Sequence, residues 1–133
     1  TAGGLLHALS KLKANSFLVL NGDTYFAVPL KTLRAFHKEN GAQVSMALFR
    51  SDNPRYTGVS LDARAKVSLA GGPFANGGVF LFERGCLPKA GFNLEKDLLP
   101  AIKNIYGLVF DAPFVDIGVP EDWRAAETII SGH

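Results

Sequence analysis

Stretches with helical periodicity alternate with short apolar runs along the first part of the chain. Leucines recur at helical spacing over residues 3–14, and residues 30–39 form a second amphipathic stretch that stops at Asn40-Gly41. Residues 16–20 are a continuous apolar run, as in a strand covered on both faces, and residues 42–49 alternate as a strand does. Helix, strand, helix and strand in this order are typical of a parallel sheet covered by helices, so the sequence predicts an α/β fold.

The rest of the chain has shorter apolar pieces and two further helical stretches. Strands are expected at residues 59–62, 66–69, 77–83, 108–110 and 113–115. Asn93 is placed to cap a helix that begins at Leu94, in which Pro100 either produces a kink or starts a second segment. Pro120 suits the first position of a last helix. We expect this helix to turn an apolar stripe inward, made of Trp123, Ala126, Ile129 and Ile130.

Size and composition indicate one folded domain and exclude several classes of partner. The chain has 133 residues, of which 47% are hydrophobic, and its formal net charge is +2. The basic residues are scattered, so no basic stripe is available to bind nucleic acid. No apolar run is long enough to span a bilayer, so no membrane partner is expected. The single cysteine, Cys86, cannot form an internal disulfide, which makes a reduced, cytoplasmic setting the default expectation.

Two aspartates each follow an apolar run and have a glycine within two positions. Asp23 comes after the run at residues 16–20 and is preceded by Gly22, while Asp116 ends an apolar piece and precedes Gly118 by two positions. Ligands of open α/β sheets collect at the carboxyl ends of strands, and carboxylates there suit Mg²⁺. The alternative is that Asp23 belongs to an ordinary Asn-Gly-Asp turn and that Asp116 is a lone surface aspartate. The residues alone do not show that the two side chains meet.

Two further pairs of residues allow both a functional and an ordinary structural interpretation. Asn76 and Gly77 precede a strongly apolar strand, where they could let the backbone approach a ligand or could form a tight turn. Glu95 and Lys96 lie in the first turn of an expected helix, where they could contact a ligand or could be an ordinary solvated helix start.

Six motifs occur in an order that resembles a known enzyme family. They are TAGG (1–4), FLVLNGD (17–23), YTGVSLD (56–62), NGGVF (76–80), LEKDLLP (94–100) and VDIGVPEDW (115–123). Together they resemble the sugar-1-phosphate nucleotidylyltransferases, and among these the guanylyltransferases that act on mannose 1-phosphate or manno-heptose 1-phosphate. The resemblance extends from the first residue to the last expected helix.

This resemblance implies a fold and a role for each matching residue. The fold would be a Rossmann-like, mostly parallel sheet flanked by helices, of the nucleotide-diphospho-sugar transferase type. Asp23 and Asp116 would hold Mg²⁺ and act in catalysis with Lys96, which would contact the sugar phosphate. The nucleotide would be bound by Thr1, Ala2, Gly3 and Gly22. The sugar pocket would be lined by Gly58, Asn76, Gly77 and Glu95.

The chain also departs from the family pattern. The glycine-rich loop with which the family begins, and the Pro-Lys-Pro that follows it, are absent, so the first βαβ element is missing. An extra residue separates Tyr56 from Gly58, and residues 63–75 are short for the family. We therefore expect one nucleotidyltransferase domain over residues 1–133 that is the C-terminal part of a longer enzyme and has little activity alone.

The implied reaction transfers a nucleoside monophosphate, most simply GMP, from a nucleoside triphosphate to a sugar 1-phosphate and releases pyrophosphate. Two alternatives stay open. One is a glycosyltransferase that uses a nucleotide sugar, although its usual Asp-x-Asp is absent because Thr24 and Tyr25 follow Asp23. The other is a non-catalytic domain that binds sugar nucleotides. The sequence leaves open the nucleobase, the sugar and whether the protein forms a homo-oligomer.

Overall fold

The computed structural model describes residues 2–89 and 93–132 and contains three α-helices and eight strands in these ranges. The helices are α1 (Ala2–Leu9), α2 (Leu30–Glu39) and α3 (Pro120–Ser131). The strands are β1 (Ser16–Leu20), β2 (Thr24–Phe26), β3 (Val44–Arg50), β4 (Ser60–Leu61), β5 (Val67–Ser68), β6 (Phe74–Glu83), β7 (Ile105–Val109) and β8 (Phe114–Asp116). Short helical turns span Pro54–Tyr56, Arg84–Cys86, Leu94–Leu98 and Leu99–Ala101.

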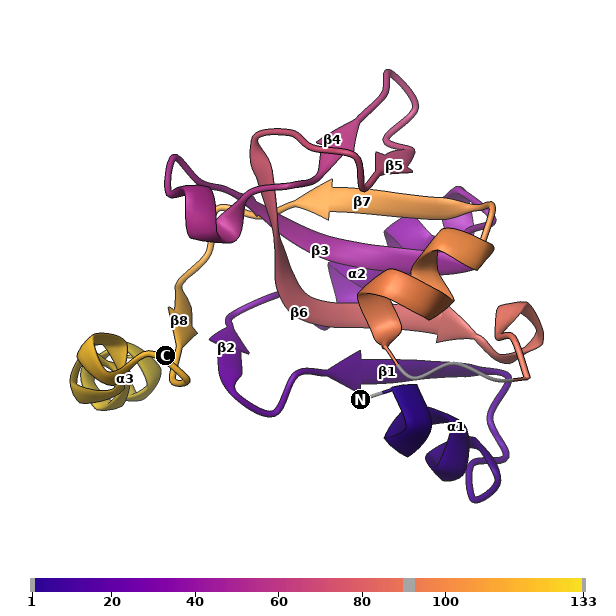
Figure 1. Ribbon diagram of the computed structural model, residues 1–133, viewed down its shortest axis with the longest axis horizontal. Helices are drawn as coiled ribbons and strands as arrows, with labels where there is room; N and C mark the ends of the chain where they lie inside the picture. Colours follow the sequence, from indigo (N-terminus) through magenta and orange to yellow (C-terminus); the bar gives the residue numbers. More distant parts are fainter. Residues whose placement is uncertain (1, 90–92, 133) are drawn as a thin grey trace.

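Four of these strands form the central sheet, in the order β1-β6-β3-β7 (Figure 1). Strands β1, β3 and β7 run in the same direction, and β6 runs against them between β1 and β3. The ladder between β3 and β7 is therefore parallel, while both ladders of β6 are antiparallel. The expected α/β class and the helix-flanked sheet are confirmed, and the sheet is mixed because the longest strand is inserted in the opposite direction.

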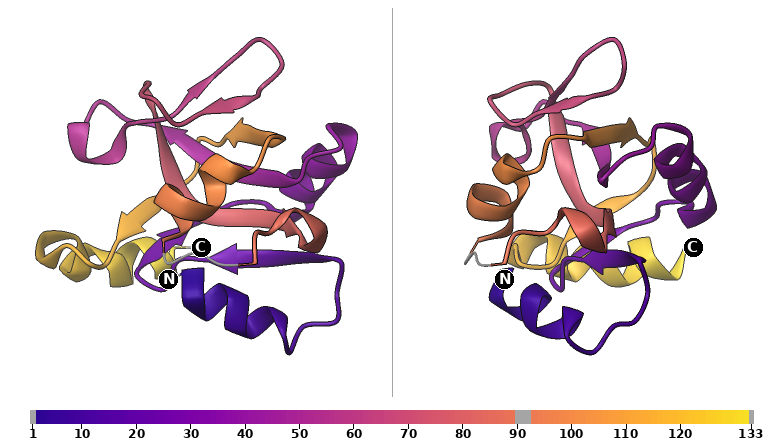
Figure 2. Two further views of the ribbon diagram at one scale, coloured as in Figure 1. Left: turned by 45° about the vertical axis from the view of Figure 1, so that its right-hand side comes forward. Right: turned by 90° about the vertical axis from the view of Figure 1, so that its right-hand side faces the viewer.

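The sheet is covered on both faces, and alternate residues of β3 point into the two hydrophobic clusters on these faces. Val44, Met46 and Leu48 point into a core that also includes Phe17, α1 and the turn at Leu94–Leu98. Ala47 points to the opposite face, where α2 packs beside Phe26 and other aromatic rings. The two later views show α2 on one side of the sheet and the turn at Leu94–Leu98 on the other (Figure 2).

The expected helix at Leu94 forms, in two segments. The Asn93 side chain accepts hydrogen bonds from the backbone N–H groups of Glu95 and Lys96 at 3.0 and 2.9 Å, as an N-cap does. The first segment is a π-helical turn, and the second, a 3-10 turn, has Pro100 as its second residue. Pro100 thus lies at the start of a new segment and does not produce a kink in a longer helix.

The prediction for the last helix was wrong in part. α3 begins at Pro120, as expected, and Ala126 is buried. However, Trp123 is 68% exposed and Ile130 is 42% exposed. Ile129 is half-buried. The reason for the exposure is that α3 packs against the short strand β8 and lies to the side of the central sheet, so Trp123 and Ile130 have no opposing layer in the described structure (Figure 1).

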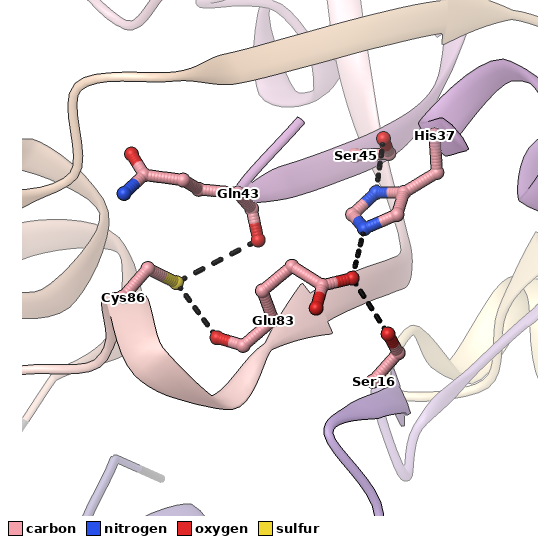
Figure 3. A network of polar contacts seen from close by, with 6 residues as sticks. All are labelled: Ser16, His37, Gln43, Ser45, Glu83 and Cys86. Carbon is pink, nitrogen blue, oxygen red and sulfur yellow. Dashed lines mark hydrogen bonds and ion pairs between the residues drawn. The ribbon is translucent and has the colours of Figure 1, made fainter. Parts of the chain in front are cut away.

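A network of polar side chains joins α2 to three strands of the sheet (Figure 3). His37 of α2 is buried, with Nδ1 2.7 Å from the Ser45 hydroxyl on β3 and Nε2 2.8 Å from the Glu83 carboxylate on β6. Ser16 of β1 donates to the same Glu83 oxygen at 2.6 Å. These contacts satisfy the polar groups of a helix that otherwise packs through apolar residues.

Candidate functional site

The two aspartates singled out from the sequence lie side by side. β2 pairs with β8 so that Thr24 lies opposite Asp116, and the Ile117 N–H donates to the carbonyl oxygen of Asp23 at 2.9 Å. A β-carbon placed on Gly118 would lie 3.0 Å from Asp116 Oδ1 and 3.5 Å from Asp23 Oδ2. Both carboxylates therefore border the same small space beside Gly118, where a side chain would intrude.

The Asp116 carboxylate is held by two hydrogen bonds. The Gly118 N–H donates to its Oδ1 at 3.0 Å, and the Tyr56 hydroxyl donates to its Oδ2 at 3.2 Å. Burial and the neighbouring Asp116 charge raise the pKa of Tyr56, so this hydroxyl keeps its proton and acts as the donor. Asp23 is exposed, and in the described part of the chain its carboxylate accepts no hydrogen bond.

A first cavity of about 550 Å³ extends from Asp23 to α1 and the turn at Leu94–Leu98. Its wall has apolar parts from α1 and the end of β1 and polar parts from the residues that follow β1. The lining residues include Leu5, Leu20, Asn21, Gly22, Asp23 and Glu95.

A second cavity of about 380 Å³ adjoins the first on the other side of Asn21 and Glu95, which line both. It is bordered by the turn that carries Tyr56 and Gly58 and by Asn76 of β6. The Asn76 amide donates to Glu95 Oε1 at 3.3 Å, so β6 and the Leu94 turn are joined at the boundary. Two compartments of different lining thus adjoin at Asn21 and Glu95, and of the two aspartates Asp23 lines the first while Asp116 lines neither.

Comparison with known proteins gives this arrangement a context. A D-glycero-alpha-D-manno-heptose 1-phosphate guanylyltransferase of Aneurinibacillus thermoaerophilus is 32% identical and aligns with 96% of this chain and 61% of its own length. A mannose-1-phosphate guanylyltransferase of Mycobacterium tuberculosis is 29% identical over 99% of this chain and 42% of its own length. This chain is homologous to sugar-1-phosphate guanylyltransferases. No protein-family model matches it.

The fold is similar to that of a solved structure. The crystal structure of HddC from Yersinia pseudotuberculosis complexed with GMP-PN superposes with a TM-score of 0.79 and 26% sequence identity. The alignment covers 95% of this chain and 60% of that one, so the chain spans about 60% of the length of HddC and of the Aneurinibacillus thermoaerophilus relative. Among the described residues, no helix has the length and apolar character needed to cross a membrane.

Several residues that the guanylyltransferase resemblance selected lie away from the two cavities. Lys96 is exposed and lines neither cavity, although it directly follows Glu95. Ala2 is fully buried in the core and Gly3 is exposed, while Leu5 of the same helix reaches the first cavity. Thr1 lies outside the described residues.

The glycines of the expected sugar pocket differ in what the structure requires of them. Gly58 lines the second cavity and has a φ of +128°, which disfavours any residue with a side chain. Gly77 is buried, and a β-carbon on it would overlap the Phe26 ring and lie 3.2 Å from the Ala47 carbonyl oxygen. Packing therefore explains Gly77 fully, whereas Gly58 combines a strained backbone position with a place in the cavity.

Asn21 and Tyr56 border the site, and sequence reasoning gave neither a role. Asn21 directly precedes Gly22 and Asp23, so its position in the motif was a signal that could have been used. Tyr56 reaches Asp116 from a turn that is far away in the chain, and no spacing rule connects the two residues. Only the folded arrangement reveals that contact.

The donor set beside Gly118 fits Mg²⁺ as a partner of a nucleotide. Within residues 2–89 and 93–132, no cluster of three or more His, Cys, Asp or Glu side chains could hold a metal ion. Asp23 and Asp116 supply two carboxylates, which is the usual protein contribution where substrate phosphates and water complete the Mg²⁺ shell. An ion held by these two carboxylates would need water or a bound phosphate for its remaining positions.

Proposed function

We propose that the protein transfers GMP from GTP to a sugar 1-phosphate of the mannose or manno-heptose type and releases pyrophosphate. The observation that carries this proposal is the pair of carboxylates, Asp23 and Asp116, of which Asp23 lines the first of two adjoining cavities. Two compartments suit two substrates, and a nucleoside triphosphate in the first cavity would bring its metal ion to Asp23. The guanylyltransferase relatives support the choice of substrates.

Asp23 and Asp116 would hold Mg²⁺, which supplies positive charge to phosphate oxygens when it is bound. The nucleotide would occupy the first cavity, with its base toward α1 and its phosphates toward Gly22 and Asp23. In the reaction an oxygen of the sugar phosphate attacks the α-phosphorus of GTP, the bond to the β-phosphate oxygen breaks, and pyrophosphate leaves. No covalent nucleophile is needed, because positioning and charge neutralisation carry transfers of this type.

The sugar 1-phosphate would occupy the second cavity. Glu95 would accept hydrogen bonds from sugar hydroxyls, and Asn76 would both donate to and accept from them. Gly58 would bring its backbone close to the sugar. Lys96 would approach the sugar phosphate from the rim, since it is exposed beside Glu95. GTP is a cytoplasmic metabolite, and we place the reaction in the cytoplasm.

The proposal is tested by measuring pyrophosphate release by the complete natural protein with GTP and mannose 1-phosphate or manno-heptose 1-phosphate. Asp23→Asn and Asp116→Asn should each remove most turnover, because each deletes a charged ligand of one metal site. The double variant should lose hardly more than the worse single variant, since residues that act as a unit are strongly non-additive. Asp111→Asn, at an exposed position outside both cavities, serves as the matched control and should keep wild-type turnover.

Two results would contradict this proposal. Release of a nucleoside diphosphate from a nucleotide sugar, without pyrophosphate release, would indicate a glycosyltransferase. Binding of a sugar nucleotide without turnover of any substrate pair would indicate a non-catalytic domain.

A further inference from the structure

The turn that carries Tyr56 brings its side chain to the carboxylate pair. The Tyr56 ring packs against Phe114, at 5.7 Å between ring centroids, and against Phe49 at 6.2 Å. These aromatic contacts fix the ring, and its hydroxyl lies 3.2 Å from Asp116 Oδ2. Phe114 lies on β8, two residues before Asp116, so one short strand supplies both the packing surface and the carboxylate.

The two carboxylates differ in how they are held. Each oxygen of Asp116 accepts one hydrogen bond, from the Gly118 N–H on one side and from Tyr56 on the other. Across residues 2–89 and 93–132, the Tyr56 hydroxyl is the only side chain that donates to Asp116. Two donors on opposite oxygens fix the rotation of a carboxylate and leave lone pairs on both oxygens free for a further ligand.

We propose that Tyr56 is a positioning residue that orients the Asp116 carboxylate toward the space it shares with Asp23. This inference rests on the proposed function, because it assigns Tyr56 to the same metal site. Hydrogen bonds to ligating carboxylates commonly set metal affinity, and their loss typically weakens binding by about 10- to 100-fold. The ring packing of Tyr56 is separate from this role and does not need the hydroxyl.

Tyr56→Phe separates the two contributions, since it keeps the ring and removes only the oxygen. The experiment measures binding of the Mn²⁺–GTP complex to the protein, with Mn²⁺ as a substitute for Mg²⁺ and without sugar phosphate, from the enhancement of water proton relaxation that occurs when the complex becomes protein-bound. We expect Tyr56→Phe to bind Mn²⁺–GTP about 10- to 100-fold more weakly than wild type, with an unchanged thermal unfolding midpoint. Tyr106→Phe, on β7 and outside both cavities, is the matched control and should bind as wild type does.

Asp116→Asn distinguishes failure of this inference from failure of the proposed function. Mn²⁺ binding that depends on Asp116 but is equal in wild type and Tyr56→Phe overturns the positioning role and leaves the metal site standing. Mn²⁺ binding that is unaffected by Asp116→Asn overturns the metal site, and the role of Tyr56 with it. Weaker binding by Tyr56→Phe with a wild-type unfolding midpoint supports the positioning role.

Discussion

The Glu83 carboxylate accepts hydrogen bonds from residues on two neighbouring elements, and this contact makes stability depend on pH. Burial by itself raises the pKa of Glu83, but hydrogen bonds from Ser16 and His37 and the attraction to His37 outweigh it. The pKa of Glu83 therefore lies below its ordinary value of 4.5. A carboxyl group with a lower pKa in the folded state stabilises the fold above its unfolded pKa, and this stabilisation is lost as the pH falls through the folded pKa.

Glu83→Gln should accordingly lower the unfolding free energy near neutral pH and should have less effect in acid. The difference in unfolding free energy between wild type and Glu83→Gln should be largest well above pH 4.5 and should shrink as the pH falls below that value. Urea unfolding at a series of pH values measures it. Glu39→Gln, at the exposed end of α2, is the control and should show no such convergence. A difference in unfolding free energy that stays constant at all pH values would contradict the lowered pKa of Glu83.

Single residues could be predicted from the sequence where local pattern decides their place. Asp23 and Asp116 were selected because each ends an apolar run, and the ladder between β2 and β8 then brings them together. His37 was not selected, because its partners lie on β3 and β6, and only the packing of α2 on the sheet creates the contact. Tyr56 was missed for the same reason, since its contact with Asp116 joins distant parts of the chain.

At the scale of elements, the packing of β6 requires Gly77 to lie in close contact with the Phe26 ring. Phe26 packs edge-on against Phe49, Phe110 and Phe114, so it has little freedom to move away from Gly77. Gly77→Ala should therefore destabilise the fold by about 1–3 kcal/mol through overpacking. Gly4→Ala, in α1 with no heavy atom within 4 Å of the added carbon, should stabilise by about 0.5–1 kcal/mol.

Thermal or urea unfolding of both glycine variants measures this contrast. Equal stability of the two variants would show that the Phe26 ring yields to an added methyl group. Gly77 directly follows Asn76, which lines the second cavity. If the Gly77→Ala protein folds and binds sugar phosphate as wild type does, Gly77 contributes to packing and not to the sugar site.

For the helix α3, the periodicity of the sequence predicts the helix but not the burial of its apolar face. Its apolar stripe predicts a buried face, but the pattern contains no information on whether another layer lies opposite. Trp123 is the only tryptophan in the chain and is 68% exposed, so native fluorescence reports this face directly. We expect acrylamide to quench the native protein nearly as well as the urea-unfolded protein. Strong protection of native Trp123 would show that this face of α3 is covered in solution.

At the scale of the whole molecule, the central sheet has an apolar edge. β1 is an edge strand of the described sheet, and its Leu18 and Leu20 are 39% and 60% exposed. Exposed apolar edge strands favour pairing between molecules, and a charged side chain opposes it. Leu18→Lys should therefore reduce self-association, measured by light scattering over a range of protein concentrations.

Leu30→Lys provides the matched control for the edge. Leu30 is 48% exposed at the start of α2, away from the edge strand, so a lysine there should leave self-association unchanged. Equal association of wild type and Leu18→Lys would show that molecules do not meet through β1.

The position of β6 between β1 and β3 also determines when the protein can fold during synthesis. β1 and β3 do not pair with each other, and Phe17 and Val44 both lie opposite Phe82. Both strands precede β6 in the chain, so they leave the ribosome before it does and have no partner in the sheet during that interval. Non-local pairing of this kind is slow and leaves apolar segments open to aggregation. We therefore expect the nascent chain to be most prone to aggregation before Glu83 emerges, because β1 and β3 are joined in the sheet only through β6.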